Sequence, residues 1–287
     1  MTRLAERMGR LGTETVFDVV ARARELEDQG RDVVHLEIGE PDFPTPPHIV
    51  EAAVAALHRA ETRYVAPVGI LPLREAIADC VGASRGIAVS PDQVVVTPGA
   101  KPIITFALLA LAQEGDEVLY PDPGFPIYES MIRFVGAKPV PLPLYESQGF
   151  CFDVAELRRL VTGRTRLLIL NSPHNPTGGL LCRRDLEAIA EIALQHDLMV
   201  LSDEIYGRLV YGGEHLSPAS LPGMQERTII MDGFSKTYAM TGWRLGYGVM
   251  NRVLAEAMRR LVINSNSCVP GFVQWAGVEA LRGPQDC

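Results

Sequence analysis

The chain has 287 residues, of which 47% are hydrophobic and 22% are charged, as in folded globular proteins rather than disordered ones. Its formal net charge is -8 and it contains no block of Lys and Arg, which argues against a nucleic-acid-binding protein. Its N-terminus lacks the apolar core of a signal peptide and no stretch is long and apolar enough to span a bilayer, so we expect no membrane association.

The predicted elements begin with a helix at 15–29, followed by a proline-rich stretch at 39–47 that is too rich in proline for regular structure. Farther along the chain, strands and helices alternate. We expect strands at 94–96, 117–120, 167–170, 198–201, 228–231 and 245–250, and helices at 101–113, 127–135, 183–196 and 253–262. This alternation predicts an α/β fold with three layers, α/β/α, around a mostly parallel mixed sheet. Residues 1–45 are expected to form an N-terminal arm, and residues 46–287 the large domain.

Cysteine and histidine usage gives no sign of a disulfide framework or a metal site. The five cysteines are odd in number, scattered, and never arranged as C-x-x-C. The histidines show no spacing typical of metal ligands, so we expect no bound metal. This pattern favours a reduced, cytoplasmic setting.

Chemically distinct groups follow five of the predicted strands. In open α/β sheets, ligands bind beyond the carboxyl ends of the strands, so these groups are expected to meet at one edge. They are a turn that opens a helix (Gly99, Ala100, Lys101), an aromatic ring (Phe125), an amide (Asn175), a carboxylate with a phenol (Asp203, Tyr206) and an amine (Lys236).

Each of these features, taken alone, has an ordinary structural explanation. The glycine could serve only a tight turn, Asp203 could cap a helix, Phe125 could be core, and Lys236 could be a solvated side chain. A nucleotide-binding protein is disfavoured because the sequence has neither a G-x-G-x-x-G string nor a Walker string.

Three local strings together are far more specific than any single residue. They are Asn171-Ser-Pro-His-Asn-Pro-Thr-Gly178, Ser202-Asp-Glu-Ile-Tyr206 and Ser235-Lys-Thr-Tyr-Ala-Met-Thr-Gly-Trp-Arg244. With these strings the sequence resembles the class I and II aminotransferases, the aspartate aminotransferase family of fold-type I enzymes that use pyridoxal 5'-phosphate (PLP). The resemblance runs from about Gly39 to the end of the chain.

The resemblance implies a role for each group around the cofactor ring. Lys236 would form the Schiff base (aldimine) with PLP, and Asp203 would pair with the pyridine nitrogen. Tyr206 and Asn175 would hydrogen-bond the phenolic oxygen of the ring, and Phe125 would stack on its face. A partly buried lysine beside other cations has a lowered pKa, which suits an amine that must act as a nucleophile and a proton carrier.

The resemblance also implies a phosphate site and a shared dimer site. The phosphate would be bound by the backbone of Gly99, Ala100 and Lys101 at a helix N-terminus, by Arg244, and by the Ser235 hydroxyl. Gly233 stands where one common family version has a hydroxyl residue, so one phosphate contact is missing. The family pattern further implies the following: Tyr64 reaches the phosphate of the neighbouring subunit in a homodimer, Gly39 and Asn175 contact the substrate, and the Asn175–Pro176 bond is cis.

The implied reaction is a ping-pong transamination between an L-amino acid and a 2-oxo acid. In the family, an arginine binds the α-carboxylate of the substrate, and no residue of this sequence matches that arginine. We also expect most of the small domain to be missing, except for the part of it that residues 1–45 contribute. Two alternatives stay open: a PLP-dependent C–S lyase or cyclopropane-forming synthase on the same scaffold, and a truncated PLP-binding module without turnover. The sequence does not identify the amino donor.

Overall fold

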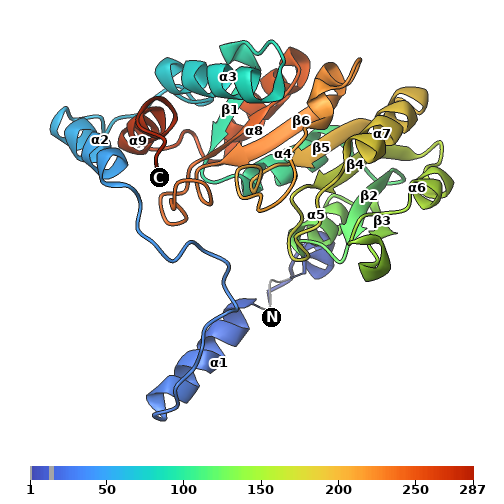
Figure 1. Cartoon of the computed structure of the whole chain (residues 1–287), viewed down its shortest axis with the longest axis horizontal. Helices are drawn as coiled ribbons and strands as arrows, with labels where there is room; N and C mark the ends of the chain where they lie inside the picture. Colours follow the sequence, from blue (N-terminus) through green and yellow to red (C-terminus); the bar gives the residue numbers. More distant parts are fainter. Residues whose placement is uncertain (1, 13–15) are drawn as a thin grey trace.

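The computed structural model describes residues 2–12 and 16–287. A compact body contains the sheet, and an N-terminal arm extends away from it (Figure 1). The arm comprises the short 3-10 helix η1 (Glu6–Arg10), which lies against the body at α5, and helix α1 (Val16–Asp28), which projects outward. The predicted helix at 15–29 is therefore confirmed over Val16–Asp28 and ends one residue earlier than expected, while Thr15 lies outside the described residues.

The described strands form one mixed sheet in the order β1-β7-β6-β5-β4-β2-β3. Neighbouring strands are parallel except for β7, which runs antiparallel to both β1 and β6. This confirms the mostly parallel mixed sheet. The strands are β1 (Val94–Thr97), β2 (Glu117–Asp122), β3 (Lys138–Pro143), β4 (Thr165–Asn171), β5 (Met199–Asp203), β6 (Thr228–Gly233) and β7 (Gly246–Val249).

Helices cover both faces of the sheet, which confirms the three-layer arrangement (Figure 1). One face packs against α4 (Lys101–Leu111), α5 (Ile127–Phe134) and α8 (Arg252–Ser265). The other face is divided. Helices α3 (Leu71–Arg85) and α9 (Gly271–Arg282), with α2 (Pro47–His58) beside α9, cover β1, β7 and β6, whereas α6 (Val154–Leu160) and α7 (Arg183–Gln195) cover β2 to β5. Four short 3-10 helices complete the body: η2 (Pro91–Gln93), η3 (Glu146–Gln148), η4 (Pro218–Ser220) and η5 (Gln225–Arg227).

The central strands are buried on both faces, so their sequences are nearly continuous apolar runs, as is typical of parallel sheets. In β4, Leu167, Leu168 and Ile169 are at most 1% exposed. Strand β3 was not predicted because prolines occupy alternate positions along it. It forms nonetheless because it is an edge strand, where a residue without an N–H group removes no hydrogen bond on the open side.

Helices α2, α3, α6 and α9 were also not predicted, and α4 ends at Leu111, two residues earlier than expected. The proline-rich stretch contains no helix or strand before α2 begins at Pro47, as predicted. The division of the chain into an N-terminal arm of residues 1–45 and a large domain of residues 46–287 stays a prediction. Within the described residues, no helix combines the length and apolarity needed to cross a bilayer.

Candidate active site

A cleft of about 810 Å³ lies at the carboxyl ends of the parallel strands, where the sequence predicted a ligand site. It brings together side chains and backbone from the body and from the arm. The predicted residues that line it are Gly39, Ala100, Lys101, Phe125, Asn175, Asp203, Tyr206, Ser235, Lys236 and Arg244.

Lys236 follows β6 and lies partly buried in this cleft. Its ammonium group donates a hydrogen bond to the Gly39 carbonyl, and its Nζ lies 5.9 Å from the centre of the Tyr206 ring. Burial lowers the pKa of Lys236; Glu40 opposes this shift and the charge of Arg244 adds to it. A lowered pKa raises the share of neutral amine, the form that attacks carbonyl carbon.

Asp203 is the last residue of β5 and is 4% exposed. The Tyr128 hydroxyl donates a 2.6 Å hydrogen bond to Asp203 Oδ2, and the Ile205 N–H donates one of 3.3 Å to Oδ1. Burial raises the Asp203 pKa to about 7, although both hydrogen bonds act in the opposite direction. A cationic partner entering the cleft would favour the ionised carboxylate.

The loop after β4 is held by a buried amide, Asn171. Its Oδ1 accepts a 2.8 Å hydrogen bond from the Asn175 N–H, and its Nδ2 donates to the carbonyls of Asp203 at 3.1 Å and Pro173 at 3.2 Å. The loop carrying Asn175 is thereby tied to the strand carrying Asp203. The Asn175–Pro176 bond is cis, as predicted.

The turn between β1 and α4 has the form of an anion cradle. Gly99 has φ +81°, a conformation that favours glycine, and a Cβ atom at this position would overlap the Arg244 guanidinium. The Thr97 hydroxyl donates a 2.6 Å hydrogen bond to the Gly99 carbonyl, which fixes the turn. Lys101 opens α4, and its Nζ lies 5.0 Å from the centre of the Phe125 ring. A helix N-terminus beside a guanidinium suits a phosphate group.

Comparison with known proteins agrees with this geometry. The family model for aminotransferase class I and II matches residues 31–287. The chain belongs to the class I and II aminotransferases. Aromatic-amino-acid aminotransferase 2 of Thermococcus litoralis is 46% identical over 252 residues, which cover 87% of this chain and 65% of that protein. Aspartate/prephenate aminotransferase of Thermus thermophilus is 40% identical over 285 residues, which cover 99% of this chain and 74% of that protein.

A solved structure of aspartate aminotransferase from Thermus thermophilus with maleate superposes with a TM-score of 0.95 at 39% identity, covering 98% of this chain and 73% of that one. The predicted family and fold are therefore confirmed. The chain spans about two thirds to three quarters of the length of these relatives. No comparison favours the lyase or synthase alternative.

Sequence reasoning missed Tyr128 of this aminotransferase-family site, as it did the buried Asn171. Tyr128 lies three residues after Phe125, at the start of α5, and the two rings meet edge to face with centroids 5.8 Å apart. The spacing of one helical turn between two aromatic residues was a possible signal, but it is equally typical of a helix packed in a core.

Two predicted residues lie outside the lining of the cleft. Gly99 is directly behind it, against Arg244. Tyr64 is 91% exposed and is not among the residues that line the cleft, and its predicted contact with a neighbouring subunit stays a prediction.

A second hollow of similar volume, about 810 Å³, lies at the opposite, amino-terminal edge of the sheet. It is lined mainly by apolar and amide side chains, with Glu226 and Arg252 as its charged residues. In the part of the chain that the structure describes, no group of His, Cys, Asp and Glu side chains could hold a metal ion.

The raised pKa of Asp203 makes a prediction for the stability of the chain without ligand. Because the folded chain holds a proton that the unfolded chain has released, Asp203 should reduce the free energy of unfolding as pH rises from about 4 to about 7, by on the order of 2–4 kcal/mol. Urea unfolding at several pH values tests this. The Asp203→Asn variant should lack this part of the pH dependence, and identical profiles for both proteins would contradict the prediction.

Proposed function

We propose that this chain binds PLP covalently at Lys236 and acts in transamination between an L-amino acid and a 2-oxo acid. The observation that carries the proposal is the placement of the Lys236 amine and the buried Asp203 carboxylate in one cleft with an anion cradle. Membership in the class I and II aminotransferases supports the same reaction.

The donor set of the cleft fits PLP at each end of the molecule. The α4 N-terminus with Gly99 and Ala100, the Arg244 guanidinium and the Ser235 hydroxyl suit the phosphate. At the other end, the Asp203 carboxylate suits a protonated pyridine nitrogen, while Asn175 and Tyr206 offer donors to the phenolic oxygen. Phe125 supplies an apolar face for the ring.

When bound, PLP supplies an electron sink for the carbanion that forms at the substrate Cα. The protein then has two tasks. Asp203 holds a positive charge at the pyridine nitrogen through its buried carboxylate. Lys236 accepts the proton from the substrate Cα, which requires the neutral amine that burial and Arg244 favour.

The substrate and partner assignments also belong to this proposal. Gly39 and Asn175 line the cleft where the substrate carboxylate would lie. The exposed Tyr64 is suited to contact a second subunit of a homodimer with a shared site. All five cysteines are free, which supports a reduced, cytoplasmic setting.

A donor panel tests the reaction. The chain would be loaded with PLP and mixed with single amino acids, and the released 2-oxo acid would be quantified in the absence of an acceptor. A transaminase should release one 2-oxo acid per bound cofactor, because the amino nitrogen stays on the cofactor. Continuous release of pyruvate and ammonia would instead identify a lyase, and absence of any reaction with every donor would favour a binding module.

Gly99→Ala should weaken PLP affinity by at least about tenfold, because the new methyl group needs the space of the Arg244 guanidinium. Gly86→Ala is a matched control. Gly86 also has a positive φ, +65°, but a Cβ there meets no atom within 4 Å. Both variants should lose stability, by about 1 kcal/mol or more, whereas only Gly99→Ala should lose affinity in an absorbance titration. Equal affinities for the two variants would contradict the cradle assignment.

A further inference from the structure

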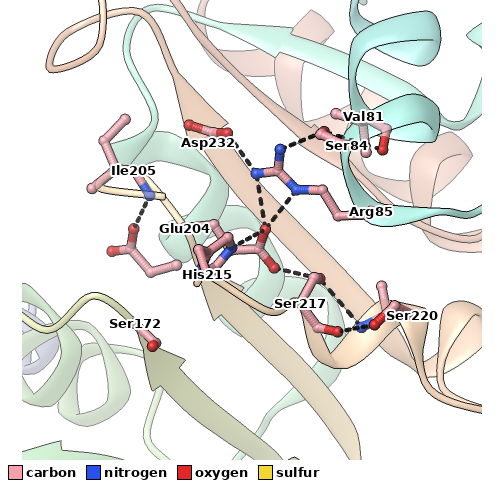
Figure 2. Close-up of polar contacts among 12 residues, drawn as sticks. Val81, Ser84, Arg85, Ser172, Glu204, Ile205, His215, Ser217, Ser220 and Asp232 are labelled. Carbon is pink, nitrogen blue, oxygen red and sulfur yellow. Dashed lines mark hydrogen bonds and ion pairs between the residues drawn. The ribbon is translucent and has the colours of Figure 1, made fainter. Parts of the chain in front are cut away.

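An ion cluster of Arg85, Glu204 and Asp232 lies at the end of β5, the strand that ends at Asp203 (Figure 2). Arg85, the last residue of α3, crosses to the sheet with its side chain only 7% exposed. Its Nε and Nη2 each lie 3.0 Å from Glu204 Oε2, and its Nη2 lies 3.0 Å from Asp232 Oδ2. One guanidinium therefore faces two carboxylates.

Both carboxylates have further partners. Glu204 accepts a 2.6 Å hydrogen bond from the Ser217 hydroxyl, and its Oε2 lies 3.1 Å from His215 Nε2. Burial opposes ionisation of Glu204, but His215, the Arg85 charge and Ser217 hold its pKa at about 2. Burial raises the pKa of Asp232, against the charge of Arg85.

The cluster and the cofactor-facing carboxylate are close along the backbone but lie on opposite faces of the sheet. Asp203 bonds Tyr128 of α5, on one face, whereas the next residue, Glu204, bonds Arg85 of α3, on the other. Successive side chains at a strand end point in opposite directions, which explains this division. On the adjacent strand β6, Met231 pairs with Asp203 and precedes Asp232. Two buried acidic side chains, Asp203 and Glu204, and the partly buried Asp232 thus lie around the ends of β5 and β6.

We propose that Arg85 is a positioning residue whose guanidinium offsets the buried negative charge of Glu204 and Asp232, so that Asp203 can ionise near neutral pH. This inference rests on the proposed function, in which Asp203 serves as the carboxylate at the pyridine nitrogen. It adds to that function a cation, Arg85, that is not among the residues that line the cleft.

Two negative charges of the cluster act on Asp203. The charges of Asp232 and Glu204 both act to raise the Asp203 pKa, beyond the effect of burial. Removing Arg85 would leave these two charges uncompensated in a region of low dielectric, where like charges interact strongly. The titratable and charged groups around Asp203 and the cluster include Tyr128 from α5, Tyr206 after β5, Glu204, Asp232, Tyr247 of β7 and His215, together with Arg208 and Tyr238, which both interact electrostatically with Asp232.

The test is a pH titration of the Asp203 carboxyl in the chain without cofactor. Aspartate would carry ¹³C at the carboxyl carbon, and the Asp203 resonance would be assigned from its loss in Asp203→Asn. Arg85→Met should raise the midpoint by at least about one pH unit, whereas Arg85→Lys, which keeps the charge, should stay close to the parent. The double variant Arg85→Met with Glu204→Gln should return toward the parent value, because it removes one charge of each sign.

An unchanged midpoint in folded Arg85→Met would overturn the proposal. If that variant does not fold, Glu204→Gln gives an independent result, since removing one carboxylate while keeping Arg85 should lower the midpoint, and an unchanged midpoint there would contradict the proposal. The titration requires no PLP. Failure of the proposed function would appear separately, as an absence of PLP binding by the parent chain.

Discussion

Lys236→Ala is expected to abolish transamination, with a fall in rate of at least about 10⁴-fold. The variant lacks both the amine that bonds the cofactor and the base that accepts the Cα proton, so two functions are lost with one side chain. The purified variant should also lose the visible absorbance of covalently held PLP. Absorbance spectra and 2-oxo acid release from the same preparations measure both effects.

Lys101→Ala and Lys138→Ala are suitable controls because the chain contains only these two other lysines. Lys138 lies on edge strand β3, where its Nζ is 3.0 Å from Glu117 Oε1, away from the cleft. Both variants should retain covalently held PLP, with weaker phosphate binding in Lys101→Ala. Retained absorbance in Lys236→Ala, together with its loss in Lys101→Ala, would show that the wrong amine had been chosen.

Asp203→Asn is expected to leave covalent attachment of PLP in place and to lower the transamination rate by about 10³-fold or more. The amide is nearly the same size as the carboxyl group, so packing in the buried site changes little. It cannot hold a positive charge at the pyridine nitrogen, and the electron sink fails. Single-turnover kinetics with one amino acid donor would separate this chemical defect from weaker binding.

Tyr128→Phe provides the matched comparison for Asp203→Asn. It removes the 2.6 Å hydrogen bond to Asp203 Oδ2 while keeping the carboxylate and the edge-to-face contact with Phe125. The rate should fall by about 10- to 100-fold, because one hydrogen bond to a charged group is worth about 1.5–3 kcal/mol, and this loss is smaller than that expected for Asp203→Asn. Comparable losses in both variants would mean that orientation of the side chain, rather than its charge, limits the reaction.

Most residues of the cleft could be predicted because they follow strands whose positions the sequence made plain. Strands β4 and β5 are continuous apolar runs, so the polar residues that end them, such as Asp203, stood out. The parallel topology then brings Lys236, Asp203 and Asn175 to one edge, although they are far apart along the chain. The family resemblance, not the spacing, supplied the cofactor and the role of each residue.

The supporting contacts could not be predicted in the same way. Arg85 ends a helix that was not predicted, and its partners Glu204 and Asp232 are 119 and 147 residues away along the chain. Tyr128 was assigned to a predicted helix, but its contact with Asp203 depends on how α5 packs on the sheet. Such pairs depend on tertiary packing, to which hydrophobic periodicity is insensitive.

The most direct test of the account is to find which amine holds PLP. The chain would be incubated with PLP, reduced with borohydride to make the bond permanent, digested, and analysed by mass spectrometry. We expect the cofactor to be attached to the peptide that contains Lys236. Attachment to Lys101 or Lys138 instead, or to no peptide, would contradict this expectation.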